Sequence, residues 1–197
     1  QVGAGGQVRL PLAQALFGNL PASIAPTASG ASFTGGEVRE AKGLEQVHMA
    51  LALEAPGYRD DAVYASQVFA TALGGGMSSR LFQEIREVRG LCYSIFAQAG
   101  SYADSGMLTI YAGTGAEQIG ELLNITIDEL ARSAETLSDA EIARARAQMK
   151  AGLLMGLESA SSRAERSARL LAIWDRVPGL DETVERIDAV TPDVLRG

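Results

Sequence analysis

Histidine and cysteine are almost absent from this chain of 197 residues, which has one of each, His48 and Cys92. A catalytic zinc ion usually takes three protein ligands from His, Glu, Asp or Cys and leaves one position open for water. The sequence contains neither H-E-x-x-H nor H-x-x-E-H, the patterns that place two histidines on successive turns of one helix. The chain is therefore predicted to hold no metal of its own, which argues against an autonomous zinc-dependent catalyst.

Basic charge and long apolar runs are also scarce. The formal net charge is -7, which argues against binding to nucleic acid, because phosphates demand clustered Lys and Arg. No segment approaches the roughly 20 apolar residues that span a bilayer. A hydrophobic content of 47% over 197 residues is typical of one globular domain. We expect neutral or basic peptides as partners, with no nucleic acid and no membrane.

The two rare side chains have ordinary structural interpretations. His48 lies in the alternating run VHMALAL at 47–53, which predicts a strand with His48 packed or hydrogen-bonded in place rather than bound to a metal. Cys92 is expected to be a small buried hydrophobe, since a nucleophilic cysteine needs a histidine base close by. A single cysteine cannot form an internal disulfide and is compatible with a reducing compartment.

The periodicity of apolar residues predicts an α+β order of elements. Strands are expected at 36–40, 46–53, 93–101 and 106–113, the last two as a hairpin. Residues 10–21 are expected to form a short helix followed by a turn. Further helices are expected at 60–74, 78–89 and 116–133, from 138 to a break near 159–162, from that break through 174, and from 191. Residues 21–36, rich in Pro, Ser, Ala, Thr and Gly, are typical of a linker. The prediction is an antiparallel sheet with helices packed on one face.

Local signals fix several helix ends. Ser138 and Glu141 match the capping box S-x-x-E and predict a helix start. Ser78 or Ser79 is expected to cap the helix at 78–89. Gly90 stands where a left-handed residue ends a helix.

Two groups of glycines stand out. Gly74, Gly75 and Gly76 allow a sharp turn or the close approach of another backbone. We reject a phosphate-binding loop there, because a P-loop needs Lys followed by Ser or Thr after its second motif glycine. Gly152 and Gly156 form G-x-x-x-G on a helix with charged flanks, which predicts tight packing against another soluble element rather than pairing in a membrane.

The run from Leu73 to Tyr93, LGGGMSSRLFQEIREVRGLCY, joins the glycine loop to a charged helix and to the R-x6-Y spacing of Arg86 and Tyr93. With DSGMLTIYAGT and ARAQMKAGLLMGLESASSRAE farther on, it resembles the non-catalytic domain of pitrilysin-type zinc peptidases, the family of mitochondrial processing peptidase. The resemblance covers most of the chain. It implies a remnant of a preceding domain at 1–20, a linker at 21–36 and the inactive C-terminal domain of that fold at 37–197.

The resemblance also implies roles for individual residues. In that family the matching arginine and tyrosine reach toward a bound peptide and toward zinc held by the other half of the molecule. Tyr93 would then stabilise an oxyanion, and Arg86 would bind a substrate carbonyl or carboxylate through its fork of N–H groups. Arg80 and the glycine loop at 74–76 are lesser candidates for substrate binding. Zinc is the implied cofactor of the full-length protein, with ligands outside this chain.

The residues by themselves allow a simpler interpretation. Glu84, Arg86, Glu87 and Arg89 have the spacing of a solvated helix face, and Tyr93 is compatible with an ordinary strand aromatic. The loop, the spacing and the hairpin taken together favour a substrate-contacting pair.

Three functions remain open at this point. The chain is the C-terminal half of a zinc metalloendopeptidase, inactive by itself; or a natural non-catalytic subunit that serves a metal-bearing partner; or a degenerate scaffold resembling respiratory-complex core proteins. The presence of both Arg86 and Tyr93 weighs against the scaffold. We expect a homo- or heterodimer, in a bacterial cytoplasm rather than a mitochondrial matrix.

Overall fold

The structure is a computed structural model that describes residues 4–21 and 29–196. Internal contacts divide the chain into two units, Gln1–Gly30 and Ala31–Gly197. The first unit holds α1 (Ala4–Phe17), which begins earlier than the predicted residue 10 and is followed by a turn. Residues 22–28 of the predicted linker lie outside the described residues. The assignment of 1–20, 21–36 and 37–197 to separate parts of the protein stays a prediction.

The second unit is built on a three-stranded antiparallel sheet. Its strands β1 (Val47–Ala55), β2 (Ser94–Ser101) and β3 (Gly106–Thr114) lie in the order β1-β3-β2, which confirms the hairpin and the strand around His48. The predicted strand at 36–40 is wrong, since these residues form no ladder. A strand needs a partner for its backbone hydrogen bonds, and no described strand pairs with this segment.

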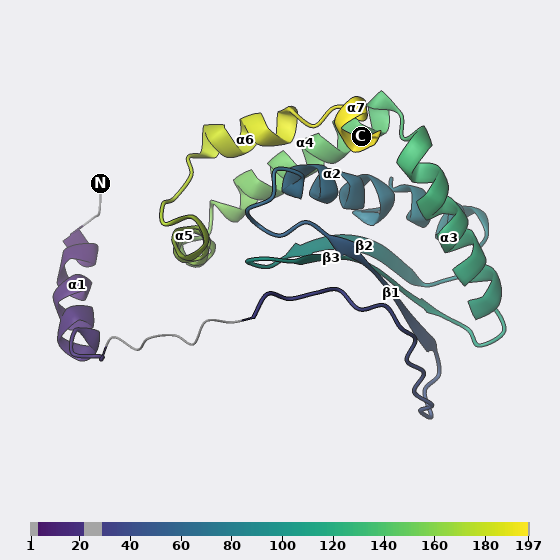
Figure 1. The fold of residues 1–197 in the computed structure, drawn as a ribbon, viewed down its shortest axis with the longest axis horizontal. Helices are drawn as coiled ribbons and strands as arrows, with labels where there is room; N and C mark the ends of the chain where they lie inside the picture. The colour runs from purple at the N-terminus through teal and green to yellow at the C-terminus, as the bar shows by residue number, and fades with distance from the viewer. Residues whose placement is uncertain (1–3, 22–28, 197) are drawn as a thin grey trace. The chain divides into compact units, whose positions relative to one another are not determined.

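The helices gather on one face of the sheet, as predicted (Figure 1). They are α2 (Val63–Gly74), a π-helix η1 (Phe82–Val88), α3 (Ile119–Thr136), α4 (Asp139–Gly156), α5 (Ala160–Trp174), α6 (Leu180–Asp188) and α7 (Pro192–Arg196). Exposure alternates along β1, so that every second side chain faces the helices. The opposite face of the sheet carries His48 and the other exposed positions of the strand.

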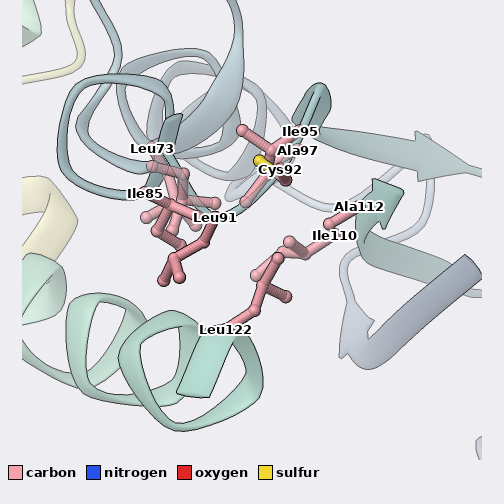
Figure 2. Packing of buried hydrophobic residues seen from close by; sticks show 10 residues of the cluster. Leu73, Ile85, Leu91, Cys92, Ile95, Ala97, Ile110, Ala112 and Leu122 are labelled. Carbon is pink, nitrogen blue, oxygen red and sulfur yellow. The ribbon is translucent and has the colours of Figure 1, made fainter. Parts of the chain in front are cut away.

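The main core joins η1 to the sheet and to α3. Leu73, Ile85, Ile110 and Leu122 are completely buried, and they come from α2, η1, β3 and α3. Figure 2 shows these side chains converging. Burying an aliphatic side chain of this size stabilises the fold by roughly 1.5–3 kcal/mol. Cys92 lies in the same cluster, which confirms its predicted burial, and that burial raises the pKa of its thiol.

In the C-terminal third, α4 and α5 begin where the sequence predicted a helix start. Both hydrogen bonds of the capping box between Ser138 and Glu141 are present at the start of α4. The predicted break near the serines is confirmed, because Ser159 accepts a hydrogen bond from the backbone N–H of Ser162 and starts α5.

The prediction for Gly152 and Gly156 is wrong. Among residues 4–21 and 29–196, no atom outside the helix lies within 4 Å of the place where a Cβ would stand on either glycine. Both glycines line a groove of about 480 Å³ between α4 and α5. Helix α5 therefore does not pack directly against the two glycines.

Candidate functional site

The segment that carries Arg86 winds differently from the prediction. Helical backbone begins at Arg80, but from Phe82 to Val88 it is a π-helix rather than an α-helix. The predicted serine caps are also wrong. No side chain caps this helix, and the hydroxyl of Ser79 is buried with no partner among the described residues. A turn from Gly76 to Ser79 directs that hydroxyl into the interior instead.

The chain reverses direction after η1, so that the start of β2 lies beside this helix. The N–H of Leu91 donates to the carbonyl of Ile85 at 3.0 Å, which closes a wide last turn. Gly90 has φ of +64°, which confirms the left-handed residue predicted there. The N–H of Tyr93 then donates to the carbonyl of Gly113 at 3.3 Å and fixes the start of β2. This reversal places Tyr93 against the helix face that presents Arg86.

Arg86 is held by aromatic rings rather than by an acid. Its guanidinium carbon lies 4.6 Å from the centre of the Phe82 ring and 5.5 Å from the centre of the Tyr93 ring. The nearest carboxylate is that of Glu87, whose Oε1 is 3.9 Å from Nε of Arg86. Among the described residues, nothing accepts a hydrogen bond from this guanidinium. The side chain is 37% exposed.

Tyr93 is the more open member of the pair. It is 78% exposed, and its hydroxyl has no hydrogen-bond partner in the part of the chain that the structure describes. A phenol and a guanidinium side by side, both with unused donors, form a surface suited to carbonyl or carboxylate oxygens.

The two other arginines of this segment, Arg80 and Arg89, already donate hydrogen bonds to residues of this chain. Nε and Nη2 of Arg89 both donate to Oε1 of Glu84, at 3.0 and 2.8 Å. Arg80 donates from Nε to Glu141 at 2.6 Å and from Nη1 and Nη2 to Thr136 at 2.7 and 2.6 Å. These bonds tie the start of η1 to α3 and α4. The structure therefore brings Arg86 and Tyr93 together and places Arg80 elsewhere, with its donors used internally.

The glycine loop at 74–76 is packed between elements, away from Arg86 and Tyr93. A Cβ on Gly74 would lie 2.6 Å from the Cβ of Ala97 and 3.0 Å from its Cα, so glycine is needed for α2 to approach β2. The carbonyl of Gly75 accepts a hydrogen bond from the side chain of Gln148 on α4, and Gly76 faces the same glutamine. Close packing explains these glycines without a ligand.

The ion pair of Arg80 and Glu141 predicts a pH dependence of stability. The hydrogen bond from Arg80 lowers the pKa of Glu141 from its ordinary 4.5 to about 2. Because the folded pKa is depressed, the stabilisation is fully present above about pH 4.5 and is lost as the pH falls toward 2. In urea titrations, we expect Glu141→Gln to unfold more easily than wild type at pH 7, by ~3 kcal/mol at most. That difference should shrink between pH 5 and pH 2; a constant difference would contradict the assignment.

One contact of this region was not predicted from the sequence, and another confirms a prediction. The contact between the Phe82 ring and Arg86 was not predicted, although the i, i+4 spacing of the two residues permits it. On the open face of the sheet, Nδ1 of His48 lies 2.7 Å from the hydroxyl of Tyr111, which confirms a hydrogen-bonded histidine. Tyr111 also stacks with Phe96, at 5.1 Å between ring centres.

The described residues contain no group of three or more His, Cys, Asp or Glu side chains arranged to hold a metal ion. Within residues 4–21 and 29–196, no helix combines the length and the apolar character needed to cross a membrane.

The family description "Peptidase M16 inactive domain" matches residues 7–149. The chain belongs to this family. The match confirms the resemblance to the non-catalytic domain of pitrilysin-type peptidases, and with it the predicted fold.

Relatives of the chain are named as zinc proteases. An uncharacterized zinc protease of Streptomyces coelicolor is 40% identical over 153 residues, which cover 77% of this chain and 33% of the relative. An uncharacterized zinc protease of Bacillus subtilis is 36% identical over 157 residues, which cover 79% of this chain and 38% of the relative. The chain thus spans little more than a third of the length of these relatives.

Solved structures share the fold. A chain of complex III2 from Candida albicans, with Inz-5 bound, has a TM-score of 0.82 at 25% identity and covers 94% of this chain and 47% of its own length. A protease from Helicobacter pylori has a TM-score of 0.79 at 20% identity, over 100% of this chain and 49% of its own. Each solved chain is about twice as long as the region that it shares with this one.

Proposed function

We propose that this chain is the substrate-binding C-terminal half of a zinc metalloendopeptidase that hydrolyses peptides or presequences inside a closed chamber. Membership of the M16 inactive-domain family and relatives named as zinc proteases support this proposal. The observation that carries it is the pairing of Arg86, whose donors have no acceptor among the described residues, with the exposed Tyr93. The described residues do not fit a zinc ion, so we assign the metal to the other half of the protein.

In this proposal the two side chains act on different parts of the peptide. The guanidinium of Arg86 donates two parallel hydrogen bonds to a backbone carbonyl or a carboxylate of the substrate and holds the peptide in register. The hydroxyl of Tyr93 donates to the scissile carbonyl oxygen as that oxygen gains negative charge, which lowers the barrier to hydrolysis. Arg80 and the glycines at 74–76 support the fold around the site rather than contact the peptide.

A natural partner subunit is the second candidate. Such a subunit would present Arg86 and Tyr93 to a metal-bearing chain encoded separately, in a homo- or heterodimer. The scaffold alternative shares its fold with the chain from Candida albicans complex III2, but it gives no reason for the unused donors of Arg86. The bacterial relatives favour a bacterial origin, and we propose the cytoplasm as its compartment.

The gene sequence and one reconstitution test this proposal. We expect the reading frame upstream of Gln1 to encode H-x-x-E-H; a start codon near Gln1, with the motif in a neighbouring gene, favours the partner subunit instead. The protein that contains the motif should bind zinc and cleave an unstructured peptide only when this chain is present. Full cleavage without this chain, or absence of the motif from the frame and its neighbours, would contradict the peptidase assignment.

A further inference from the structure

Phe82 links the main core to Arg86. It is half-buried and packs against the main core cluster that includes Ile85 and Leu122. It stands four residues before Arg86 on η1, and its ring centre lies 4.6 Å from the guanidinium carbon. Residues at this spacing share one helix face. The core therefore fixes the ring, and the ring presents a π-face to Arg86.

A ring and a carboxylate hold an arginine in different ways. The attraction between a cation and a π-face uses no N–H donor, whereas Glu84 occupies two donors of Arg89 and Glu141 occupies two donors of Arg80. The guanidinium of Arg86 lies over the Phe82 ring and donates no hydrogen bond to any described residue. This arrangement fixes Arg86 in position and leaves its fork open for a ligand.

The second ring is far more exposed than the first. Tyr93 is 78% exposed, and its ring centre lies 5.5 Å from the guanidinium carbon. A side chain with so little packing can follow a substrate oxygen, but it cannot by itself hold Arg86 in place. The restraint on Arg86 must come from the ring that the core anchors.

We propose that Phe82 is a positioning residue, which orients the guanidinium of Arg86 for a peptide oxygen before the substrate arrives. The proposal rests on the assignment of Arg86 as a peptide ligand. Preorganisation of a flexible side chain lowers the entropy lost on binding. Loss of the ring should therefore weaken binding and leave the chemical step nearly unchanged.

The test compares variants of the full-length enzyme on one peptide substrate. Phe82→Leu should raise KM on the order of fivefold with little change in kcat, and Phe82→Tyr, which keeps the π-face, should restore the wild-type KM. Phe69→Leu is the matched control, because Phe69 packs against the same core cluster but from α2, whereas the described rings beside Arg86 are those of Phe82 and Tyr93. It should leave KM unchanged.

A double-mutant cycle separates this role from a structural one. In an Arg86→Ala background, Phe82→Leu should have no further effect on KM, since the residue acts only through Arg86. A wild-type KM for Phe82→Leu while Arg86→Ala is impaired would overturn the inference and leave the proposed function intact. An equal rise in KM for Phe82→Tyr and Phe82→Leu would overturn it as well. Wild-type kinetics for Arg86→Ala would instead overturn the proposed function.

Discussion

Replacing Tyr93 with phenylalanine is expected to lower kcat for peptide hydrolysis by the full-length protein about 100-fold or more. Removal of one donor to a developing oxyanion costs about 3–4 kcal/mol of transition-state stabilisation. The substitution removes only the hydroxyl and keeps the ring beside Arg86, whose guanidinium carbon lies 5.5 Å from the ring centre. KM should therefore change much less than kcat.

A second exposed tyrosine provides the control for this experiment. Tyr102 is 62% exposed at the turn between β2 and β3, remote in sequence from Arg86, and Tyr102→Phe should leave kcat unchanged. Zinc content should be the same in both variants, because the described residues contain no group that could hold a metal ion. Equal kcat values for Tyr93→Phe and wild type would rule out the oxyanion role.

Gly74→Ala is expected to destabilise the fold by about 3 kcal/mol or more, at the upper end of overpacking effects. Its Cβ would lie 2.6 Å from the Cβ and 3.0 Å from the Cα of Ala97. The neighbour is the backbone of β2, which is hydrogen-bonded to β3 at this point and cannot shift by itself. α2 would have to withdraw from the sheet and open the core around Leu73.

The matched control is an exposed glycine within a helix. Gly152→Ala places a methyl group in open space on α4, and it should stabilise the protein by roughly 0.5–1 kcal/mol, because alanine loses less backbone entropy in a helix. Urea unfolding of both variants measures the two effects with opposite signs. If Gly74→Ala were as stable as wild type, the close approach of α2 and β2 would be wrong, and the glycine loop would need a functional explanation.

The sequence predicted those parts of the fold that follow from local pattern. Alternation in VHMALAL identified β1, and the pair Ser138 and Glu141 identified the start of α4, because each signal is complete within a few residues. The strand at 36–40 was wrong for the opposite reason, since a strand exists only where a partner pairs with it. The π-winding of η1 was also missed, because over seven residues its repeat is too close to that of an α-helix to separate.

The candidate site was predictable only in part, because contacts between side chains distant in the sequence leave no local pattern. Arg86 and Tyr93 were found through their spacing, and the structure places them together. Arg80 is an arginine of the same segment, but it donates hydrogen bonds to Glu141, which lies 61 positions farther along the chain. No local pattern distinguishes an arginine with a distant partner from one without. The contact of Phe82 with Arg86 likewise depends on side-chain placement that spacing only permits.

The most direct test of the central claim compares Arg86→Ala with Arg89→Ala in the full-length protein. Both remove an arginine from the same segment, but the donors of Arg89 are used by Glu84, whereas those of Arg86 have no partner among the described residues. We predict that Arg86→Ala lowers kcat/KM for a peptide about 10- to 100-fold, as expected for loss of charged hydrogen bonds, with zinc content unchanged. Arg89→Ala should stay close to wild type. Equal kcat/KM values for the two variants, or loss of zinc in Arg86→Ala, would contradict the account.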